Sequence, residues 1–270
     1  MKPTERGVAL ITGASSGIGL LTAQALRQRG YRVFGTSRKP MAVTADGTEM
    51  LVCDVTDDAS VLGTVEEVMR RASRIDLLVN NAGFGIEGAA EESSIAQVHA
   101  LFDTNFYGLV RMTNAVLPIM RAQGSGRILN VGSVAGFVPM PFGSYYAATK
   151  HAIEGYSESL DHEVRRFGVR VAVIEPAATR TSFESRTMPS DTPNAAYDAI
   201  RANYKVAFDK AMAVAVSPDG VAETIVLAAQ DSAPRLRYPS GRLAHQLAFV
   251  RRFLPSSIFD RALRKQLGLA

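Results

Sequence analysis

The sequence is poor in residues that support metal or disulfide chemistry. Cys53 is the single cysteine among 270 residues, which excludes an internal disulfide and any thiolate cluster and indicates a reducing compartment. The four histidines form no spaced ligand set with one another or with other residues; they are His99, His151, His162 and His245. We therefore expect no metal centre.

Long hydrophobic runs are also missing. The apolar stretch from Gly7 to Thr12 is too short for a secretory signal or a membrane span, and it runs into a glycine turn. We find no internal repeat, low-complexity segment or interdomain linker. A chain of 270 residues with 47% hydrophobic content can bury one sizeable core. These features predict a cytoplasmic protein built as a single domain.

Short β-branched runs alternate with longer segments of helical periodicity. The expected strands are 8–12, 32–36, 50–55, 75–80, 127–131 and 169–174, with a short last strand at 237–239; the expected helices are 17–29, 58–72, 95–122, 145–167 and 218–230. Such alternation predicts βαβ units and a parallel sheet. Right-handed crossovers favour a Rossmann-type, doubly wound α/β fold with helices on both faces and its ligand site at the carboxyl ends of the strands.

The basic charge belongs to the C-terminal tail. Residues 235–270 carry eight basic side chains against Asp260 alone, a net +7, while residues 1–234 sum to −3. We expect residues 1–239 to form the catalytic domain, with a substrate loop at about 177–216, and residues 240–270 to form a basic amphipathic helical extension. Such a tail can lie on an anionic membrane, cover the substrate cleft or line a subunit interface. Nucleic acid is not expected, because stacking aromatics are not interleaved with the basic residues.

A glycine-rich turn follows the first expected strand and leads into a helix. Glycine permits a tight turn, and a helix N-terminus offers amide hydrogens to a pyrophosphate. The candidate ligands are Gly13, Ser15, Ser16, Gly17, Ile18 and Gly19. A second glycine run, from Gly83 to Gly88, matches the usual dinucleotide spelling, but no helix is expected at its end. We interpret it as loop glycines lining the cleft.

A carboxylate is absent where the second strand ends. An NAD-selective enzyme would carry an acidic residue there for the ribose 2′-hydroxyl. The chain instead reads Ser37-Arg38-Lys39, and a guanidinium binds a 2′-phosphate as a fork. We therefore favour NADP(H) over NAD(H), with Ser37 and Arg38 as ligands; the alternative is that the cations belong to a solvated loop.

Tyr146 and Lys150 stand four residues apart in a helical segment, so their side chains share one face. The ordinary tyrosine pKa is about 10, and a neighbouring cation favours the phenolate, which makes Tyr146 a candidate general acid/base. Tyr145 has Thr149 as its corresponding partner, so the register selects Tyr146. Ser133 lies thirteen residues before Tyr146.

These motifs together resemble the classical short-chain dehydrogenase/reductase family. The glycine turn, Asn80-Asn81-Ala82-Gly83, Ser133 and the Tyr146/Lys150 pair follow one another in the family's order, and the likeness covers residues 7 to about 239. The resemblance implies that Tyr146 exchanges the substrate proton and Ser133 hydrogen-bonds the substrate oxygen. It also implies that Lys150 lowers the pKa of Tyr146 and binds the nicotinamide ribose.

The same resemblance assigns further positions. Asn105 matches the asparagine that holds a water in the proton relay. The implied cofactor contacts beyond the glycine turn are Asp54, Val55, Asn81, Ala82, Gly83, Tyr146, Lys150, Pro176, Thr179 and Thr181. Thr181 is the expected carboxamide ligand, with Thr179 as its competitor. Ala177 replaces a usual glycine, so the backbone there can differ from the family pattern.

Apolar residues are expected beside the nicotinamide. They are Phe84, Ile86, Phe137, Met140, Phe142 and Phe183. This lining favours a lipophilic ketone, aldehyde or secondary alcohol over a sugar or phosphorylated metabolite, although apolar loop residues also pack as core. A narrower likeness is to the hydroxysteroid and retinol dehydrogenase branch, and the family implies a homodimer or homotetramer through the helices near 95–122 and 145–167.

Two other functions remain open on the same fold. A non-catalytic NADP(H)-sensing protein would be expected to lose the tyrosine or the lysine, and this chain has both. A sugar-nucleotide epimerase or dehydratase usually needs a larger C-terminal substrate domain, for which the tail leaves little room.

Overall fold

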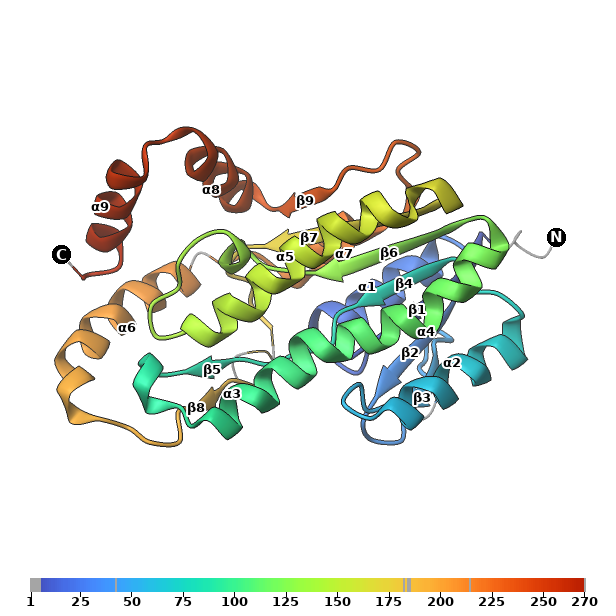
Figure 1. Ribbon diagram of the computed structural model, residues 1–270, viewed down its shortest axis with the longest axis horizontal. Helices are drawn as coiled ribbons and strands as arrows, with labels where there is room; N and C mark the ends of the chain where they lie inside the picture. The colour runs from blue at the N-terminus through green and yellow to red at the C-terminus, as the bar shows by residue number, and fades with distance from the viewer. Residues whose placement is uncertain (1–5, 42, 182, 184–185, 214, 270) are drawn as a thin grey trace.

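The computed structural model describes residues 6–41, 43–181, 183, 186–213 and 215–269. Seven parallel strands form the central sheet in the order β3-β2-β1-β4-β6-β7-β9 (Figure 1). Their bounds are β1 Gly7–Ile11, β2 Tyr31–Ser37, β3 Glu49–Val52, β4 Leu77–Asn80, β6 Gly126–Val131, β7 Val169–Pro176 and β9 Arg237–Ser240. The predicted doubly wound parallel sheet is therefore confirmed.

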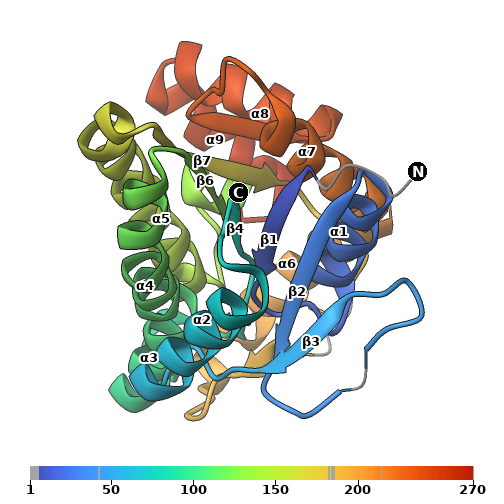
Figure 2. The same cartoon turned by 90° about the vertical axis from the view of Figure 1, so that its right-hand side faces the viewer.

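Helices cover both faces of this sheet. One face packs against α1 (Gly17–Gln28) and α7 (Pro218–Gln230), and the other against α2 (Asp58–Ala72), α4 (Gly108–Gln123) and α5 (Ser144–Val164) (Figure 2). Successive side chains of a strand point to opposite faces, so each strand contributes to both cores. In β1, for example, Leu10 joins the α2/α4/α5 core and Ile11 joins the α1/α7 core. Burial on both faces explains the continuous apolar runs of the strands.

The expected helix at 95–122 is divided by a π turn. It comprises α3 (Ile95–Phe102), a π-helical segment at Asp103–Tyr107 and α4. The region 177–216 also holds more structure than its weak pattern indicated. It contains β8 (Met188–Pro189), which pairs with β5 (Ile86–Glu87), and the helix α6 (Asp198–Ala213). Tyr204 is the only buried residue described in α6, so this helix has little apolar periodicity to detect.

The tail folds as two helices, α8 (Arg242–Phe253) and α9 (Ser256–Gln266), joined through Leu254 and Pro255. Both lie beyond β9, the edge strand of the sheet (Figure 1). Within the described residues, no helix is long and apolar enough to cross a membrane.

The strand order has a switch point between β1 and β4. β1 and β4 are neighbours, yet α1 follows β1 on one face while α4 follows β4 on the other. In such sheets ligands bind outside the carboxyl ends of the strands, at this change of direction. The glycine turn follows β1, Asn81 follows β4 and Ser133 follows β6. All three therefore lie at the carboxyl ends of the strands.

Candidate active site

The glycine turn after β1 has the geometry of a phosphate cradle. Gly13 and Gly17 have φ values of +66° and +57°, which side chains other than glycine rarely adopt. A Cβ on Gly19 would lie 2.4 Å from the Gly13 carbonyl oxygen, so a larger residue would fill the turn. Helix α1 starts at Gly17, and the first amides of a helix have no partner within the helix. The residues present therefore fit a dinucleotide pyrophosphate.

Asn81 fastens this turn to the neighbouring strand. Its side-chain amide donates hydrogen bonds to the carbonyls of Thr12 (3.0 Å) and Gly13 (3.1 Å). In return, the buried Thr12 hydroxyl accepts the backbone amides of Asn81 (2.9 Å) and Ala82 (3.0 Å). These four bonds join the carboxyl ends of β1 and β4, and they hold the turn in one shape.

Ser133, Tyr146 and Lys150 meet where β6 and α5 approach each other. Ser133 hydrogen-bonds the Tyr146 hydroxyl, and its own oxygen accepts the amide of Ala135 at 3.1 Å. The buried Lys150 ammonium donates to the Val131 carbonyl at 2.8 Å and lies 5.5 Å from the centre of the Tyr146 ring. The structure therefore brings together the three residues that the sequence singled out.

The pKa values of Tyr146 and Lys150 differ from the expectation. Desolvation raises the pKa of Tyr146 to about 12, and the hydrogen bond from Ser133 acts in the opposite direction. Desolvation also lowers the pKa of Lys150 to about 8, against the influence of Glu154. The expected lowering of the Tyr146 pKa by Lys150 is thus corrected: the ammonium bonds a backbone carbonyl, and burial dominates at both groups.

The two adjacent tyrosines have separate environments. Tyr145 donates its hydroxyl to the Ala90 carbonyl at 2.9 Å, away from Lys150. Tyr146 instead packs against Phe183, with 5.5 Å between the ring centres. This division follows the helical register that distinguished them in the sequence.

Asn105 lies in the π turn and connects several parts of the site. Its side chain accepts the Phe84 amide at 3.0 Å and donates to the Phe84 carbonyl at 2.9 Å. It also donates to Thr149, the neighbour of Lys150, at 3.3 Å. A π turn replaces the usual i→i−4 pairing, and such turns are common at functional sites.

The second glycine run lies at the site without forming a phosphate turn. A Cβ on Gly83 would lie 3.0 Å from the Asn105 side-chain oxygen, and one on Gly85 would lie 3.2 Å from the Phe183 ring. The run continues into the short strand β5 and then into a single 3-10 turn at Ala90–Glu92. Its glycines therefore allow neighbouring side chains to approach closely.

The residues expected at the adenosine end lie at the ends of β2 and β3. Arg38 is exposed just beyond Ser37, the last residue of β2. Hydrogen bonds from Thr56 lower the pKa of Asp54, and the nearby charge of Arg38 contributes in the same direction. Val55 is buried against Gly108, where an added Cβ would lie 2.6 Å from it. The described residues at the end of β2 include no acidic side chain.

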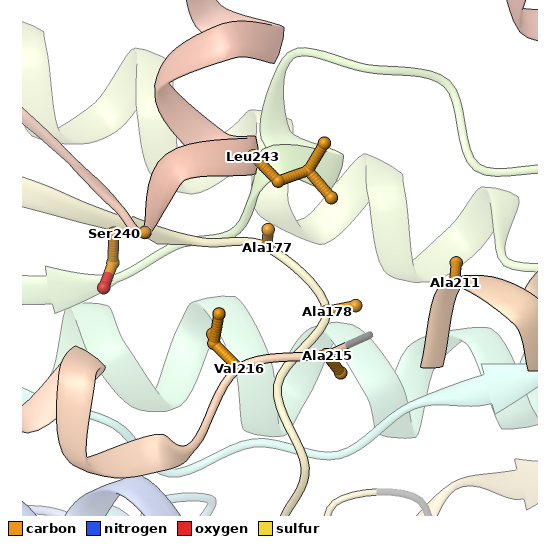
Figure 3. A pocket seen from close by; sticks show the side chains of 8 residues that line it. Ala177, Ala178, Ala211, Ala215, Val216, Ser240 and Leu243 are labelled. Carbon is orange, nitrogen blue, oxygen red and sulfur yellow. The ribbon is translucent and has the colours of Figure 1, made fainter. Parts of the chain in front are cut away.

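The segment after β7 has an ordinary backbone. Ala177 is not among the described residues with positive φ, so the replacement of glycine causes no strain there. Thr179 bonds the Ala177 carbonyl, and Thr181 accepts the Phe183 amide. A nearby hollow of about 20 Å³, suited to one water rather than a substrate, is lined by Ala177, Ala178, Ala211, Ala215, Val216, Ser240, Gly241 and Leu243 (Figure 3).

The expected substrate residues have unequal surroundings. Phe183 covers Tyr146, whereas Ile86 is buried in β5 beside Met188. Phe142 has a φ of +55°, rare for a bulky residue, and packs against Tyr204 of α6 with 5.1 Å between the ring centres. Phe137 and Met140 lie in the same loop as Phe142, between β6 and α5, and Phe84 is held by Asn105.

The chain matches the family described as short chain dehydrogenase over residues 7–191. It belongs to this family. A relative from Bacteroides thetaiotaomicron named 3-ketodihydrosphingosine reductase is 45% identical over 176 residues, which are 65% of each chain. An uncharacterized oxidoreductase of Bacillus subtilis, YusZ, is 34% identical, and the alignment covers 96% of this chain and 98% of that one.

Solved short-chain dehydrogenases share the fold. One from Streptomyces avermitilis superimposes with a TM-score of 0.80 at 32% identity, covering 96% of this chain and 95% of that one. A 3-ketoacyl-(acyl-carrier-protein) reductase from Brucella melitensis, solved with NADH, gives 0.74 at 25% identity, covering 87% and 96%. A serine dehydrogenase with NADP+ also gives 0.74, at 28% identity, covering 86% and 93%. A nicotinamide dinucleotide therefore fits the glycine turn of this oxidoreductase family member.

The sequence did not indicate a carboxylate cluster behind Tyr146 and Lys150, in which Glu154 and Glu175 are buried and Glu158 is partly exposed. Arg237 Nη1 lies 3.4 Å from Glu154 and 3.2 Å from Glu175, and its Nε bonds Glu158 at 2.8 Å. Desolvation raises the pKa of Glu154 to about 8 and that of Glu175 to about 7. One guanidinium faces three carboxyl groups, so the cluster retains a proton near neutral pH. Only the position of Glu154, one turn after Lys150, could have signalled it.

Proposed function

We propose that the protein transfers a hydride between NADP(H) and a lipophilic ketone, aldehyde or secondary alcohol, with Tyr146 as general acid/base. The observation that carries this proposal is that Ser133, Tyr146 and Lys150 meet at the carboxyl ends of the strands, where the glycine turn also lies. A binding protein without turnover would have no use for a half-buried phenol beside a buried ammonium, because removing these polar groups from water is costly.

The side chains have distinct parts in the reaction. The bound nicotinamide supplies or accepts the hydride. Ser133 donates a hydrogen bond to the substrate oxygen and stabilises the negative charge that grows there during reduction. Tyr146, whose raised pKa keeps it protonated at neutral pH, donates its proton to that oxygen. Asn105 fixes the Phe84 segment and Thr149, and so fixes the walls beside the reacting groups.

NADP(H) is the proposed form of the cofactor. Arg38 is exposed at the end of β2, where it can receive a 2′-phosphate, and Ser37 lies beside it. A carboxylate that would repel this phosphate and bind a 2′-hydroxyl is missing from the end of the strand.

A long-chain ketone is the proposed kind of substrate. Phe183 and Phe142 supply aromatic surface beside and beyond Tyr146, and the buried Tyr204 packs behind Phe142. The relative named 3-ketodihydrosphingosine reductase supports the same chemistry, a ketone near the polar end of a long alkyl chain. Apolar contact along such a chain stabilises binding by about 0.8 kcal/mol for each buried CH₂ group.

The experiment is a substrate panel read with both cofactors. Long-chain 3-ketones and short ketones are incubated with the enzyme and either NADPH or NADH, and secondary alcohols with NADP+ or NAD+. The absorbance of the reduced nicotinamide is followed in every case. We expect NADPH oxidation with the long-chain ketones and little with the short ones. Equal use of NADH would contradict the role of Arg38, and tight NADPH binding without any turnover would favour a sensor.

We also propose a homodimer or homotetramer, since members of this family are commonly oligomeric. Helices α4 and α5 are the proposed contact surface, and the exposed Tyr107 lies at the start of α4. Light scattering on the purified protein measures its mass directly.

A further inference from the structure

The surface of α8 and of its junction with α9 exposes large apolar side chains among basic ones. Phe249, Phe253 and Ile258 are 64%, 62% and 54% exposed. The two phenylalanine rings pack together, with 4.7 Å between their centres. Arg242 and Arg252 are exposed on the same helix. We call these five residues the aromatic–basic face.

Four of the five residues lie on the outer part of α8, and Ile258 lies in the first turn of α9. Residues 242, 249 and 253 are separated by seven and four positions, so they lie along one side of the helix, and Arg252 flanks them. Ala244, on the opposite side, is fully buried. A helix in contact with the protein along one side usually carries polar residues on the other. Here that outer side carries two aromatic rings.

The helix that presents this face is fixed to the domain. Arg251 Nε donates to the Phe137 carbonyl at 3.1 Å, and its guanidinium lies 5.1 Å from the centre of the Phe259 ring. Phe259 of α9 is 6% exposed and anchors the second helix. The exposed rings therefore stand on a supported element beside the loop that holds Phe137.

Charge decides which partner the face fits. Helices α8 and α9 contain six basic residues and one acidic residue, whereas the chain before residue 235 has a net charge of −3. In a two-fold dimer, a patch on one subunit meets the same patch on the other, so these cations would face each other. An anionic lipid surface instead attracts each Lys or Arg and accepts the apolar rings between its headgroups.

We propose that the aromatic–basic face docks the protein on an anionic membrane surface, with Phe249, Phe253 and Ile258 inserted among the headgroups. Arg242 and Arg252 contact lipid phosphates beside them. The docking stands on this surface alone and does not depend on the proposed reaction.

The test is sedimentation of the full chain with vesicles. One set contains phosphatidylcholine alone, and the other about three parts phosphatidylcholine to one part phosphatidylglycerol. We expect binding to the anionic vesicles, at least about tenfold weaker binding to the neutral ones, and release at about 0.5 M salt. Equal binding to both vesicle sets, or no binding to the anionic set, would overturn the proposal.

Two double variants separate the apolar and the charged contributions. Phe249→Ser with Phe253→Ser, and Arg242→Glu with Arg252→Glu, should each weaken anionic-vesicle binding by at least about tenfold. The matched controls are Leu62→Ser with Val206→Ser, at side chains 55% and 57% exposed, and Lys205→Glu with Lys210→Glu on α6. These controls should bind as the wild type does, and equal losses in test and control variants would count against the face.

Light scattering tests whether the aromatic–basic face contacts a second copy of the chain instead of a membrane. If the face were a subunit contact, the Phe249→Ser/Phe253→Ser variant would have a smaller mass than the wild type without lipid. We expect an unchanged mass and a nearly unchanged melting temperature, because both rings are largely exposed and contact mainly each other. A reduced mass would overturn the proposal in favour of self-association.

Discussion

Lys150 and Glu154 lie one turn apart on α5, with both charged groups buried behind Tyr146. The charge of Glu154 raises the pKa of Lys150, while desolvation lowers it to about 8. Glu175 and Glu158 face the same space from β7 and α5, and Arg237 of β9 bridges the three carboxyl groups. The protonation of Lys150 is therefore linked to that of the cluster.

Glu154→Gln should shift the alkaline limb of the pH profile of kcat/KM to lower pH. Below about pH 7 the Glu154 carboxyl, whose pKa is about 8, is largely protonated, so the neutral amide should behave like the wild type. Above pH 8 the wild-type carboxylate helps Lys150, the proposed ligand of the nicotinamide ribose, to keep its proton, and the amide does not. As the pH is raised, the variant should therefore begin to lose activity at a lower pH than the wild type does. Glu163→Gln, on the exposed side of α5, should follow the wild type. Superimposable profiles of Glu154→Gln and wild type would refute the linkage.

The same substitution should change how stability depends on pH. The pKa of Glu154 in the folded protein, about 8, lies above its ordinary value of 4.5. Between those values the native state binds more protons than the unfolded state, so stability falls as pH rises through this window. Urea unfolding at several pH values should give a flatter dependence for Glu154→Gln than for the wild type. If the free energy of unfolding fell equally steeply with pH in both proteins, groups other than Glu154 would cause the pH dependence.

Tyr146→Phe should abolish turnover and leave NADPH binding nearly intact. The variant keeps the ring that packs against Phe183 and loses the proton donor, which is worth about 10²- to 10⁴-fold in rate. Tyr145→Phe is the matched control, since it loses a surface bond to Ala90 and should retain most activity. Steady-state rates and a fluorescence titration with NADPH measure the two effects. Wild-type rates in Tyr146→Phe on a confirmed substrate would remove it from the mechanism.

Gly19→Ala should impair nucleotide binding. The added Cβ would lie 2.4 Å from the Gly13 carbonyl oxygen and 2.5 Å from the Asn81 side-chain nitrogen, so the turn must move. Gly63→Ala in α2 is the control, because nothing lies within 4 Å of its added Cβ. That control should raise stability by about 0.5–1 kcal/mol, as alanine favours a helix. NADPH titration and urea unfolding check both, and unaltered nucleotide affinity in Gly19→Ala would show that the turn adapts.

The sheet could be predicted from the sequence because each strand is buried on both faces. Val171, Ala172, Val173 and Ile174 are all buried, and a short continuous apolar run of this kind is typical of a strand inside a parallel sheet. The helix α6 escaped prediction for the opposite reason, since its exposed surface leaves no regular apolar stripe. The π turn was missed because its residues fit an uninterrupted helical pattern.

The candidate site also has residues that could be predicted from the sequence and residues that could not. Ser133, Tyr146, Lys150 and Asn105 could be named from motifs because local spacing and a family resemblance place them. The partners of Arg237 could not, because Glu154, Glu158 and Glu175 come from two other elements and meet it only through the sheet order. The pKa of Tyr146 was misjudged because helical spacing gives the neighbour of a group but not its burial.

The hydrogen bonds between the Thr12–Gly13 segment and the Asn81–Ala82 segment determine how short a fragment can be and still bind nucleotide. A fragment ending before β4 would contain every glycine of the phosphate turn and lose the amide that holds the Thr12 and Gly13 carbonyls. It would also leave the buried Thr12 hydroxyl without the backbone amides of residues 81 and 82. The glycine motif is therefore not a self-sufficient module in this chain, and a split or transplanted version must extend through residue 82.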